Sequence, residues 1–264
     1  MPDNSREAQE AAALIWRHWQ SSSRIDALPD ACRPVDRAAG YAVQQEVVRS
    51  SGQRVIGWKI AATSAAGQHH IGVDGPLAGP LLANKVFAPG AQLSLQGNIM
   101  NVAEAEFAFD MAIGLPSRKT PYVIEEVLAA VGSLAPAIEV PDTRFNDFAK
   151  AGAPQLIADC ACACWLVVGA RTRANWRKWD LVRHRATAYR NGALASAGEG
   201  SNVLGDPRIA LTWIANELAK FGAGLKAGDI VTTGTCIVPV AVAPGDEFRV
   251  DFGELGSVSA RLAP

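Results

Sequence analysis

Two stretches near the N-terminus carry apolar residues at the spacing of an α-helix. The first stripe lies within residues 6–20 and the second within residues 38–48. Side chains three and four positions apart fall on one face of a helix, so each stripe can pack against a core. The pattern predicts two amphipathic helices, separated by a break at residues 32–36.

Apolar runs of strand length follow at residues 55–62, 101–111, 134–140 and 158–169. After the first run, Thr63 or Ser64 is placed to cap a short helix that continues through His70. Residues 72–80 contain three glycines and two prolines, which is typical of a loop.

A helix is predicted between the second and third of these runs. Thr120-Pro121 has the form of an N-cap followed by a first-turn proline, and Gly132 is a suitable end. A helical crossover joins parallel strands, so we expect the runs at 101–111 and 134–140 to be parallel neighbours. Residues 142–156 are polar and predict a loop.

The C-terminal part of the chain is rich in short strands. Asn191-Gly192 within residues 186–194 predicts a hairpin, and Asp206-Pro207 opens a helix. Short strands are predicted within residues 229–242, 246–251 and 257–262. Because strands and helices do not alternate regularly, the pattern favours an α+β fold with a curled mixed sheet over a doubly wound sheet.

Two carboxylates share one face of the 101–111 strand. Side chains alternate along a strand, so Glu104 and Glu106 point the same way. Ionised carboxylates repel each other and are costly to desolvate, so a cation should lie between them. A bound metal ion or a buried Lys or Arg would serve.

Glu139 lies in an apolar segment, where a lone carboxylate is costly to bury. With Glu104 and Glu106 it can form an all-oxygen site for Mg²⁺ or Mn²⁺ that leaves positions open for water or substrate. Alternatively, Glu104 and Glu106 face solvent and Glu139 pairs with a buried arginine. The pattern by itself leaves both alternatives open.

Lys59 lies in the middle of an apolar strand, between Trp58 and Ile60. Burial lowers the pKa of a lysine, and such a lysine can act as a base or an acid near neutral pH. The alternative roles are those of an edge-strand lysine or of a structural partner for one of the glutamates.

Composition narrows the class of protein. The chain has 264 residues, 49% of them hydrophobic, and a net charge of −1. A sizeable core is therefore available, and there is no global attraction to nucleic acid or to an anionic membrane. No apolar run approaches the ~20 residues of a membrane span. The polar N-terminus lacks the order of a signal peptide, so we expect a cytoplasmic protein.

Five cysteines, an odd number, do not suggest a disulfide framework. Cys160, Cys162 and Cys164 would share one face of the 158–169 strand and are interpreted as small core residues. The basic segment 171–190 could contact nucleic acid through cations and aromatic rings. With a nearly neutral chain, we favour a solvated surface, a subunit contact or a region that attracts anionic substrates.

Seven short motifs occur in a fixed order, at residues 57–64, 72–76, 104–106, 136–140, 158–159, 189–192 and 226–234. Together they resemble the 2-keto-4-pentenoate hydratase branch of the fumarylacetoacetate hydrolase superfamily. The resemblance implies a mixed β-roll core with an N-terminal helical part. We expect a helical subdomain over residues 1–78, which includes the Lys59 strand, and a metal-binding catalytic core over residues 79–264, packed as one compact unit.

The resemblance also implies the site. Mg²⁺ or Mn²⁺ would be held by three ligands, Glu104, Glu106 and Glu139. Lys59 would be the active-site lysine, and the substrate would be bound near Thr63, Ser64, Leu77 and Asp159. Related enzymes are homo-oligomers that act on small anionic 2-hydroxydienoates, or their 2-oxo forms, in the meta-cleavage breakdown of aromatic compounds.

Three segments depart from the pattern of the branch. Hydratases of this branch usually carry an acid directly after the proline of the 72–76 loop, where this chain has Leu77. The related 4-oxalocrotonate decarboxylases are apolar there too. Ala158-Asp159-Cys160 stands in place of Ala-Asp-Asn, and residues 61–64 read Ala-Ala-Thr-Ser in place of Gly-Leu-Thr-Ser.

These features predict a metal-dependent lyase that hydrates 2-hydroxy-2,4-dienoates to 4-hydroxy-2-oxo acids. The alternative is a decarboxylase of the 4-oxalocrotonate type, which Leu77 keeps open. A carbon–carbon hydrolase is less favoured, because no His-Glu pair is evident for activating water. The third alternative is a non-catalytic binding protein that uses the 171–190 segment.

Overall fold

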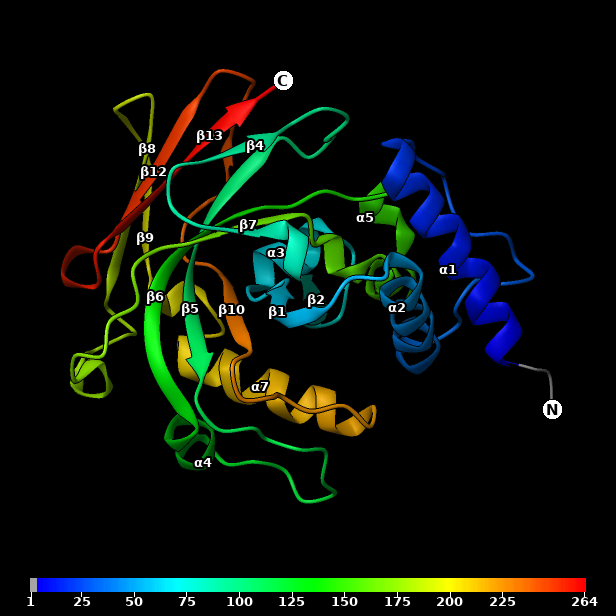
Figure 1. Cartoon of the computed structure of the whole chain (residues 1–264), viewed down its shortest axis with the longest axis horizontal. Helices are drawn as coiled ribbons and strands as arrows, with labels where there is room; N and C mark the ends of the chain where they lie inside the picture. Colours follow the sequence, from blue (N-terminus) through cyan, green and yellow to red (C-terminus); the bar gives the residue numbers. More distant parts are fainter. Residues whose placement is uncertain (1–3) are drawn as a thin grey trace.

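The computed structural model describes residues 4–264, so the first three residues of the 1–78 segment lie outside it. The structure contains two β-sheets, one through the middle of the molecule and one at its upper left, with helices to the right of the first sheet and below it (Figure 1). Both sheets contain parallel and antiparallel neighbours. The α+β class with curled mixed sheets, predicted from the sequence, is confirmed.

The larger sheet has eight strands in the order β2-β1-β10-β5-β6-β7-β3, with β11 paired to β5. Their bounds are β1 (Val55–Ala61), β2 (Leu77–Leu82), β3 (Val86–Phe87), β5 (Val102–Met111), β6 (Val131–Val140), β7 (Trp165–Val168), β10 (Ile230–Thr235) and β11 (Val240–Ala241). The strands that carry Lys59 and the three glutamates are all in this sheet, so one sheet positions the candidate site.

The second sheet has five strands in the order β4-β13-β12-β8-β9. They are β4 (Ala91–Ser94), β8 (Arg185–Arg190), β9 (Ala193–Glu199), β12 (Glu247–Asp251) and β13 (Ser257–Ala263). Asn191 and Gly192 join β8 to β9 with φ of 53° and 79°, as the predicted hairpin turn requires. Phe107 on β5 packs edge-on against Phe252, with 5.1 Å between the ring centroids, which links the two sheets.

The α-helices are α1 (Asn4–Ser21), α2 (Arg37–Ser51), α3 (Ala65–His70), α4 (Ile124–Ala129), α5 (Phe148–Ala151), α6 (Ala153–Ala158) and α7 (Pro207–Lys220). Short 3₁₀ turns lie at Ala83–Lys85, Cys160–Cys162, Trp176–Lys178, Gly200–Asn202 and Gly253–Leu255. Helices α1 and α2 pack side by side at one end of the molecule (Figure 1). Ser64 caps α3 and Asp206 caps α7, as predicted. Within the described chain, no helix combines the length and apolar character that crossing a bilayer requires.

The relation between β5 and β6 was predicted wrongly. The two strands are antiparallel, and Glu104 lies directly opposite Glu139. The intervening helix α4 has only six residues and lies beside the shared end of both strands (Figure 1). The connection therefore turns back at one end of the sheet and does not cross over it, which is the geometry of an antiparallel pair.

The helix in this connection also has different ends from those predicted. It begins after Val123, whose backbone N–H donates to the Glu126 carboxylate, and not at Thr120-Pro121. It ends before Val131, so Gly132 belongs to β6. The Glu126 carboxylate accepts a hydrogen bond from a free backbone N–H at the start of the helix, which is the role that the sequence assigned to a threonine cap.

Three loop and strand assignments are corrected as well. Part of the 72–80 loop is strand β2, whose Pro80 is tolerated because β2 is at the sheet edge. The 142–156 segment is not a polar loop, since it contains α5 and most of α6 and buries Thr143 and Arg144. The 158–169 strand is limited to β7, and Cys160 and Cys162 lie in a 3₁₀ turn before it.

Candidate metal centre

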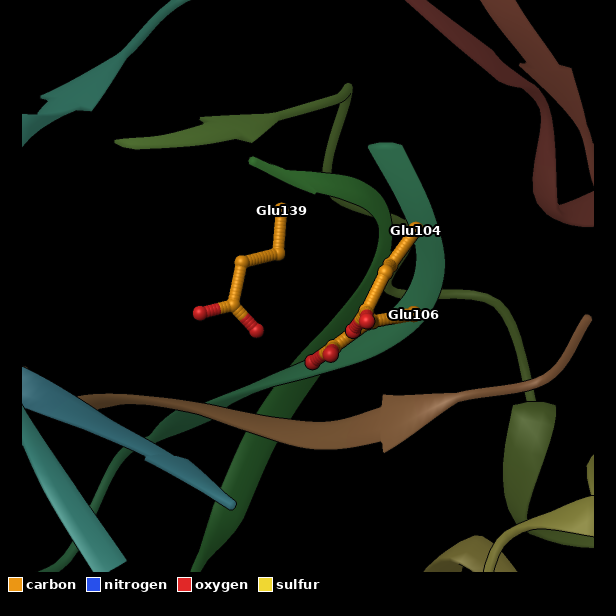
Figure 2. A group of neighbouring side chains, drawn as sticks. All are labelled: Glu104, Glu106 and Glu139. Atoms are coloured by element: carbon orange, nitrogen blue, oxygen red, sulfur yellow. The ribbon is translucent and has the colours of Figure 1, made fainter. Parts of the chain in front are cut away.

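Three carboxylates converge between β5 and β6. Glu104 and Glu106 point from β5 towards Glu139 on β6 (Figure 2), and one ligand atom from each lies within 4.8 Å of the others. The period-two spacing puts the first two on one face, and the antiparallel register puts Glu139 opposite Glu104. The three carboxylates grouped from the sequence thus lie together, although the strand direction was predicted wrongly.

The cluster is buried and short of partners. Glu106 and Glu139 are fully buried, and Glu104 is partly exposed. Within residues 4–264, Glu106 Oε1 and Glu139 Oε2 have no partner, and Glu139 Oε1 faces the Lys59 ammonium group at 3.0 Å. A buried carboxylate oxygen without a partner is costly, so the site is poised to bind a cation. Three hard oxygen ligands fit a divalent ion of the Mg²⁺ class.

Burial and mutual repulsion raise the pKa of two of these carboxyls. Burial, followed by the charge of Glu139, raises the pKa of Glu104 to about 7. The pKa of Glu106 is also raised, first by burial and then by the charges of Glu139 and Glu104. Both effects disfavour the ionised forms.

A glycine positions Glu106. The Gly234 N–H donates to Glu106 Oε2 at 3.1 Å, and the glycine has a φ of +92°. A Cβ at this position would come within 2.1 Å of Thr63 Oγ1, so only glycine fits. Thr63 is buried against this glycine, and its carbonyl accepts a hydrogen bond from the Leu204 N–H at 2.8 Å. The sequence included Gly234 in a motif but assigned it no role.

Lys59 lies on β1, between β2 and β10, so it is not an edge-strand lysine. Its Nζ is 3.0 Å from Glu139 Oε1 and donates to the Ala161 carbonyl at 3.1 Å. The sequence called for a cation at the cluster, either a bound metal ion or a buried Lys or Arg. The structure shows that a buried lysine, Lys59, is present there. Glu139 pairs with Lys59 and not with a buried arginine.

The predicted lowering of the Lys59 pKa is wrong for the metal-free protein. Burial alone would lower it, and burial is the largest single influence. The charges of Glu139, Glu104 and Glu106 together outweigh burial and raise the pKa of Lys59 above its ordinary value. The lysine is therefore held as an ammonium ion at the carboxylate cluster.

Ser64 and Leu77 lie at the two ends of the connection between β1, which carries Lys59, and β2. Ser64 accepts a hydrogen bond from the Gly67 N–H at 3.0 Å, so its hydroxyl caps α3. Leu77 starts β2, is fully buried and pairs across the sheet with Ala61. An aliphatic side chain in this position can shape a pocket but cannot transfer a proton.

Asp159 is fully buried, and its carboxylate is occupied by protein groups. Arg144 Nε and its backbone N–H, together with the Thr143 hydroxyl, donate to the two carboxylate oxygens. The sequence missed Arg144, because nothing in a single arginine of the 142–156 segment indicates burial. Direct substrate binding by Asp159 stays a prediction that these contacts do not favour.

The 171–190 segment is partly used within the fold. Arg171 pairs with Asp110 at 2.9 Å, and Arg177 donates to the carbonyl oxygen of Val131. Arg183 and Arg185 are exposed and line a surface pocket of about 500 Å³ that also contains acidic residues such as Asp251. These mixed charges do not form the continuous basic surface that nucleic-acid binding requires.

Comparisons with known proteins agree with the fold and with the class of enzyme. Residues 76–263 match the fumarylacetoacetate (FAA) hydrolase C-terminal family. The chain is 34% identical to the 2-keto-4-pentenoate hydratase of Burkholderia vietnamiensis, with 98% of each chain covered. It is 36% identical to the 2-hydroxyhexa-2,4-dienoate hydratase of Comamonas testosteroni, over 81% of this chain and 80% of that one.

A solved structure has nearly the same fold. The 4-oxalocrotonate decarboxylase of Pseudomonas putida G7, complexed with magnesium and adipate, matches 97% of each chain with a TM-score of 0.88 and 28% identity. The same decarboxylase has also been solved with calcium and acetate. The chain therefore belongs to the fumarylacetoacetate hydrolase family and is an enzyme of that family, as the ordered motifs indicated.

Proposed function

We propose that this enzyme is a divalent-metal-dependent hydratase that converts 2-hydroxy-2,4-dienoates into 4-hydroxy-2-oxo acids. The observation that carries the proposal is the convergence of Glu104, Glu106 and Glu139 beside the buried Lys59. Full-length similarity to a 2-keto-4-pentenoate hydratase supports the choice of reaction.

Glu104, Glu106 and Glu139 would hold Mg²⁺ or Mn²⁺. The unpartnered buried oxygens of Glu106 and Glu139 support this assignment, as does the magnesium bound by the similar decarboxylase. When bound, the ion supplies a Lewis acid that stabilises negative charge on the 2-oxygen of the substrate.

Lys59 is the proposed acid–base group. A bound divalent ion would neutralise the three carboxylates, whose negative charge raises the pKa of Lys59. The effect of burial would then remain, and burial lowers the pKa of Lys59. Lys59 would move the proton of the 2-hydroxyl group to C5, which gives the 2-oxo-3-enoate. Water then adds across C3 and C4, with hydroxide joining C4 and a proton joining C3. We also propose that the Thr63–Ser64 turn lies near the substrate.

Leu77 supports the alternative function. In a hydratase, a group must direct water to C4, and Leu77 offers no polar atom where the branch usually has an acid. A 4-oxalocrotonate-type decarboxylase needs only to stabilise the enolate left by loss of CO₂. The TM-score of 0.88 to such a decarboxylase agrees with this second reading.

The two functions are separated by incubating the pure enzyme and Mg²⁺ with 2-hydroxypenta-2,4-dienoate, and in parallel with 4-oxalocrotonate. Loss of the dienoate absorbance without CO₂ release is the expected result for the hydratase. Release of CO₂ from 4-oxalocrotonate, with the dienoate left intact, would replace it by the decarboxylase. Turnover of neither compound would contradict both functions.

Metal affinity is expected to rise with pH across neutrality. The pKa of Glu104 is about 7 and that of Glu106 is raised, so as the pH falls the ion must increasingly compete with protons for these carboxyls. Each proton released adds up to about tenfold in affinity per pH unit. Titration calorimetry of Mn²⁺ at pH 6 and pH 8, in buffers of different ionisation enthalpy, measures both the affinity and the protons. An affinity that stays constant, with no proton release, would contradict the buried cluster.

We further propose that the enzyme is a cytoplasmic homo-oligomer. The five cysteines are free thiols, which agrees with a reducing compartment.

We also propose that residues 1–78 and 79–264 pack as one compact unit. The position of β1 inside the eight-stranded sheet supports this, because β1 of the first part pairs with β10 of the second, and β2 (Leu77–Leu82) crosses the boundary between them. Small anionic substrates, and not nucleic acid, are the proposed partners.

A further inference from the structure

The turn that follows α6 has an unfavourable backbone. Cys160, Ala161 and Cys162 have φ angles of 53°, 51° and 61°, so three consecutive residues with a Cβ adopt the left-handed conformation. This conformation is costly for any residue except glycine, and a run of three is more costly still. Such a turn persists only where its surroundings hold it, and it is commonly found at functional sites.

A buried ion pair holds both ends of this turn. Arg144 and Asp159 are almost completely buried and form a salt bridge. Arg144 also donates to the carbonyl oxygens of Asp159, before the turn, and Ala163, after it. The hydroxyl of Thr143 donates to Asp159 Oδ2 at 2.9 Å. Since one guanidinium joins the two ends, it fixes the three residues between them.

The centre of the turn contacts Lys59. The Ala161 carbonyl accepts a hydrogen bond from Lys59 Nζ at 3.1 Å, and Glu139 Oε1 lies 3.0 Å from the same nitrogen. The amine is therefore held between the turn on one side and the carboxylate cluster on the other. Two of its three N–H directions are accounted for by these neighbours.

A glycine lets the turn come this close. Gly79 on β2 is the cross-strand partner of Lys59. A Cβ on Gly79 would lie 2.1 Å from the Cys160 carbonyl oxygen and 3.1 Å from Ala161 Cβ. Any larger residue at position 79 would push the turn outwards, and with it the carbonyl that holds Lys59.

We propose that Arg144, Asp159 and Gly79 are positioning residues for Lys59. They hold the left-handed turn so that the Ala161 carbonyl fixes the amine against the metal centre. This inference rests on the proposed acid–base role of Lys59. Proton transfer depends steeply on distance, and a displacement of about 1 Å can cost about 100-fold in rate.

The first test replaces Asp159 by asparagine. Asp159→Asn keeps the shape but removes the charge that orients Arg144. The matched control is Asp246→Asn, because Asp246 is also a buried aspartate paired with an arginine, Arg190, and it lies directly before β12 of the second sheet, whereas Lys59 is in the larger sheet. We expect kcat to fall about 100-fold in Asp159→Asn, while KM and Mn²⁺ affinity stay within about threefold of wild type. The control should retain its kcat.

The second test adds one methyl group. Gly79→Ala should lower kcat in the same way, because the turn must move. Its control is Gly224→Ala, whose Cβ would meet the Leu115 carbonyl oxygen at 2.5 Å, far along the chain from the turn. In both variants the added Cβ clashes with a backbone carbonyl oxygen, but only Gly79→Ala displaces the turn that contacts Lys59. Comparing the two variants therefore separates the effect of a local clash from the effect of losing the contact to Lys59.

A readout that needs no turnover accompanies both tests. In the metal-free protein, the ¹⁵Nζ resonance of Lys59, assigned by its absence in Lys59→Met, reports the placement of the amine. It should shift in Asp159→Asn and Gly79→Ala and stay unchanged in the two controls. If wild type turns over no substrate but this pattern is seen, the proposed function fails and the positioning inference stands.

Two results would overturn the inference. One is an unchanged Lys59 resonance in both Asp159→Asn and Gly79→Ala. The other is a fall in kcat that only tracks the loss of folded protein. Should Asp159→Asn fail to fold, Thr143→Val removes the hydrogen bond that Thr143 donates to Asp159, together with the one that its hydroxyl accepts from the Phe145 N–H, and keeps the charge of Asp159. It is read in the same way: a shifted Lys59 resonance with lowered kcat supports the inference, and wild-type values overturn it.

Discussion

Glu106→Gln is expected to weaken Mg²⁺ and Mn²⁺ binding by about 100-fold or more and to remove turnover. Loss of a residue that only supports a ligand costs about 10–100-fold, so loss of a proposed ligand should cost at least as much. Glu106 is fully buried, and its Oε1 has no partner in the described part of the chain. Glutamine keeps the shape and the acceptor for the Gly234 N–H, but it replaces one ligand oxygen by an NH₂ group. Titration calorimetry measures the affinity.

The control for this variant is Glu125→Gln, which changes an exposed glutamate on α4. Its metal affinity should equal that of wild type. The thermal midpoint of metal-free Glu106→Gln should not fall, since a buried carboxyl beside two others is replaced by a neutral group. Unchanged metal binding in Glu106→Gln would exclude the three-glutamate site.

Lys59→Met should lower kcat by about 1,000-fold while metal affinity is retained or increased. General acid–base groups contribute about 10²–10⁴-fold, which sets the size of the loss. The metal-free site holds the Lys59 ammonium 3.0 Å from Glu139, so the amine competes with an incoming ion for the same carboxylate. Methionine fills a similar volume without a charge.

The matched control is Lys119→Met, at an exposed lysine outside both sheets. It should leave kcat and metal affinity at their wild-type values. Steady-state kinetics and a metal titration on the same preparations separate the two effects. If metal affinity were lost together with activity in Lys59→Met, Lys59 would be a structural partner of the site and not its acid–base group.

The carboxylate cluster was predictable because it depends on local rules. The period of a strand fixed the common face of Glu104 and Glu106, and the cost of burying Glu139 in an apolar run indicated a shared cation. The strand direction was not predictable in this way. The residues between β5 and β6 include a helix, but its six residues lie at one end of the sheet and do not cross it.

The electrostatics of Lys59 depended on the folded arrangement. Burial could be predicted from its apolar neighbours, and by itself it lowers the pKa. The opposing charges come from Glu139, Glu104 and Glu106, which lie 45–80 positions along the chain and meet Lys59 only in the sheet. Distances between such groups decide the sign of the shift, and sequence alone does not supply them.

The turn at Cys160–Cys162 was missed for a different reason. Cysteine and alanine have no preference for positive φ, so the local sequence favours an extended strand there. The conformation is imposed by Arg144, which is fifteen residues from Asp159 and carries no local signal of burial. Residues held by tertiary contacts against their own preference are the ones that sequence patterns predict least well.

The central claim is that Glu104, Glu106 and Glu139 hold a catalytic divalent ion next to Lys59. A crystal structure with Mn²⁺ and a 2-oxo acid analogue such as 2-oxopentanoate tests it most directly, because manganese is located by its anomalous scattering. The expected result is one strong anomalous peak among the three carboxylates, with the carboxylate and 2-oxygen of the analogue on the ion and Lys59 facing the analogue. A peak elsewhere, or none at these glutamates while Lys59 still pairs with Glu139, would contradict the claim.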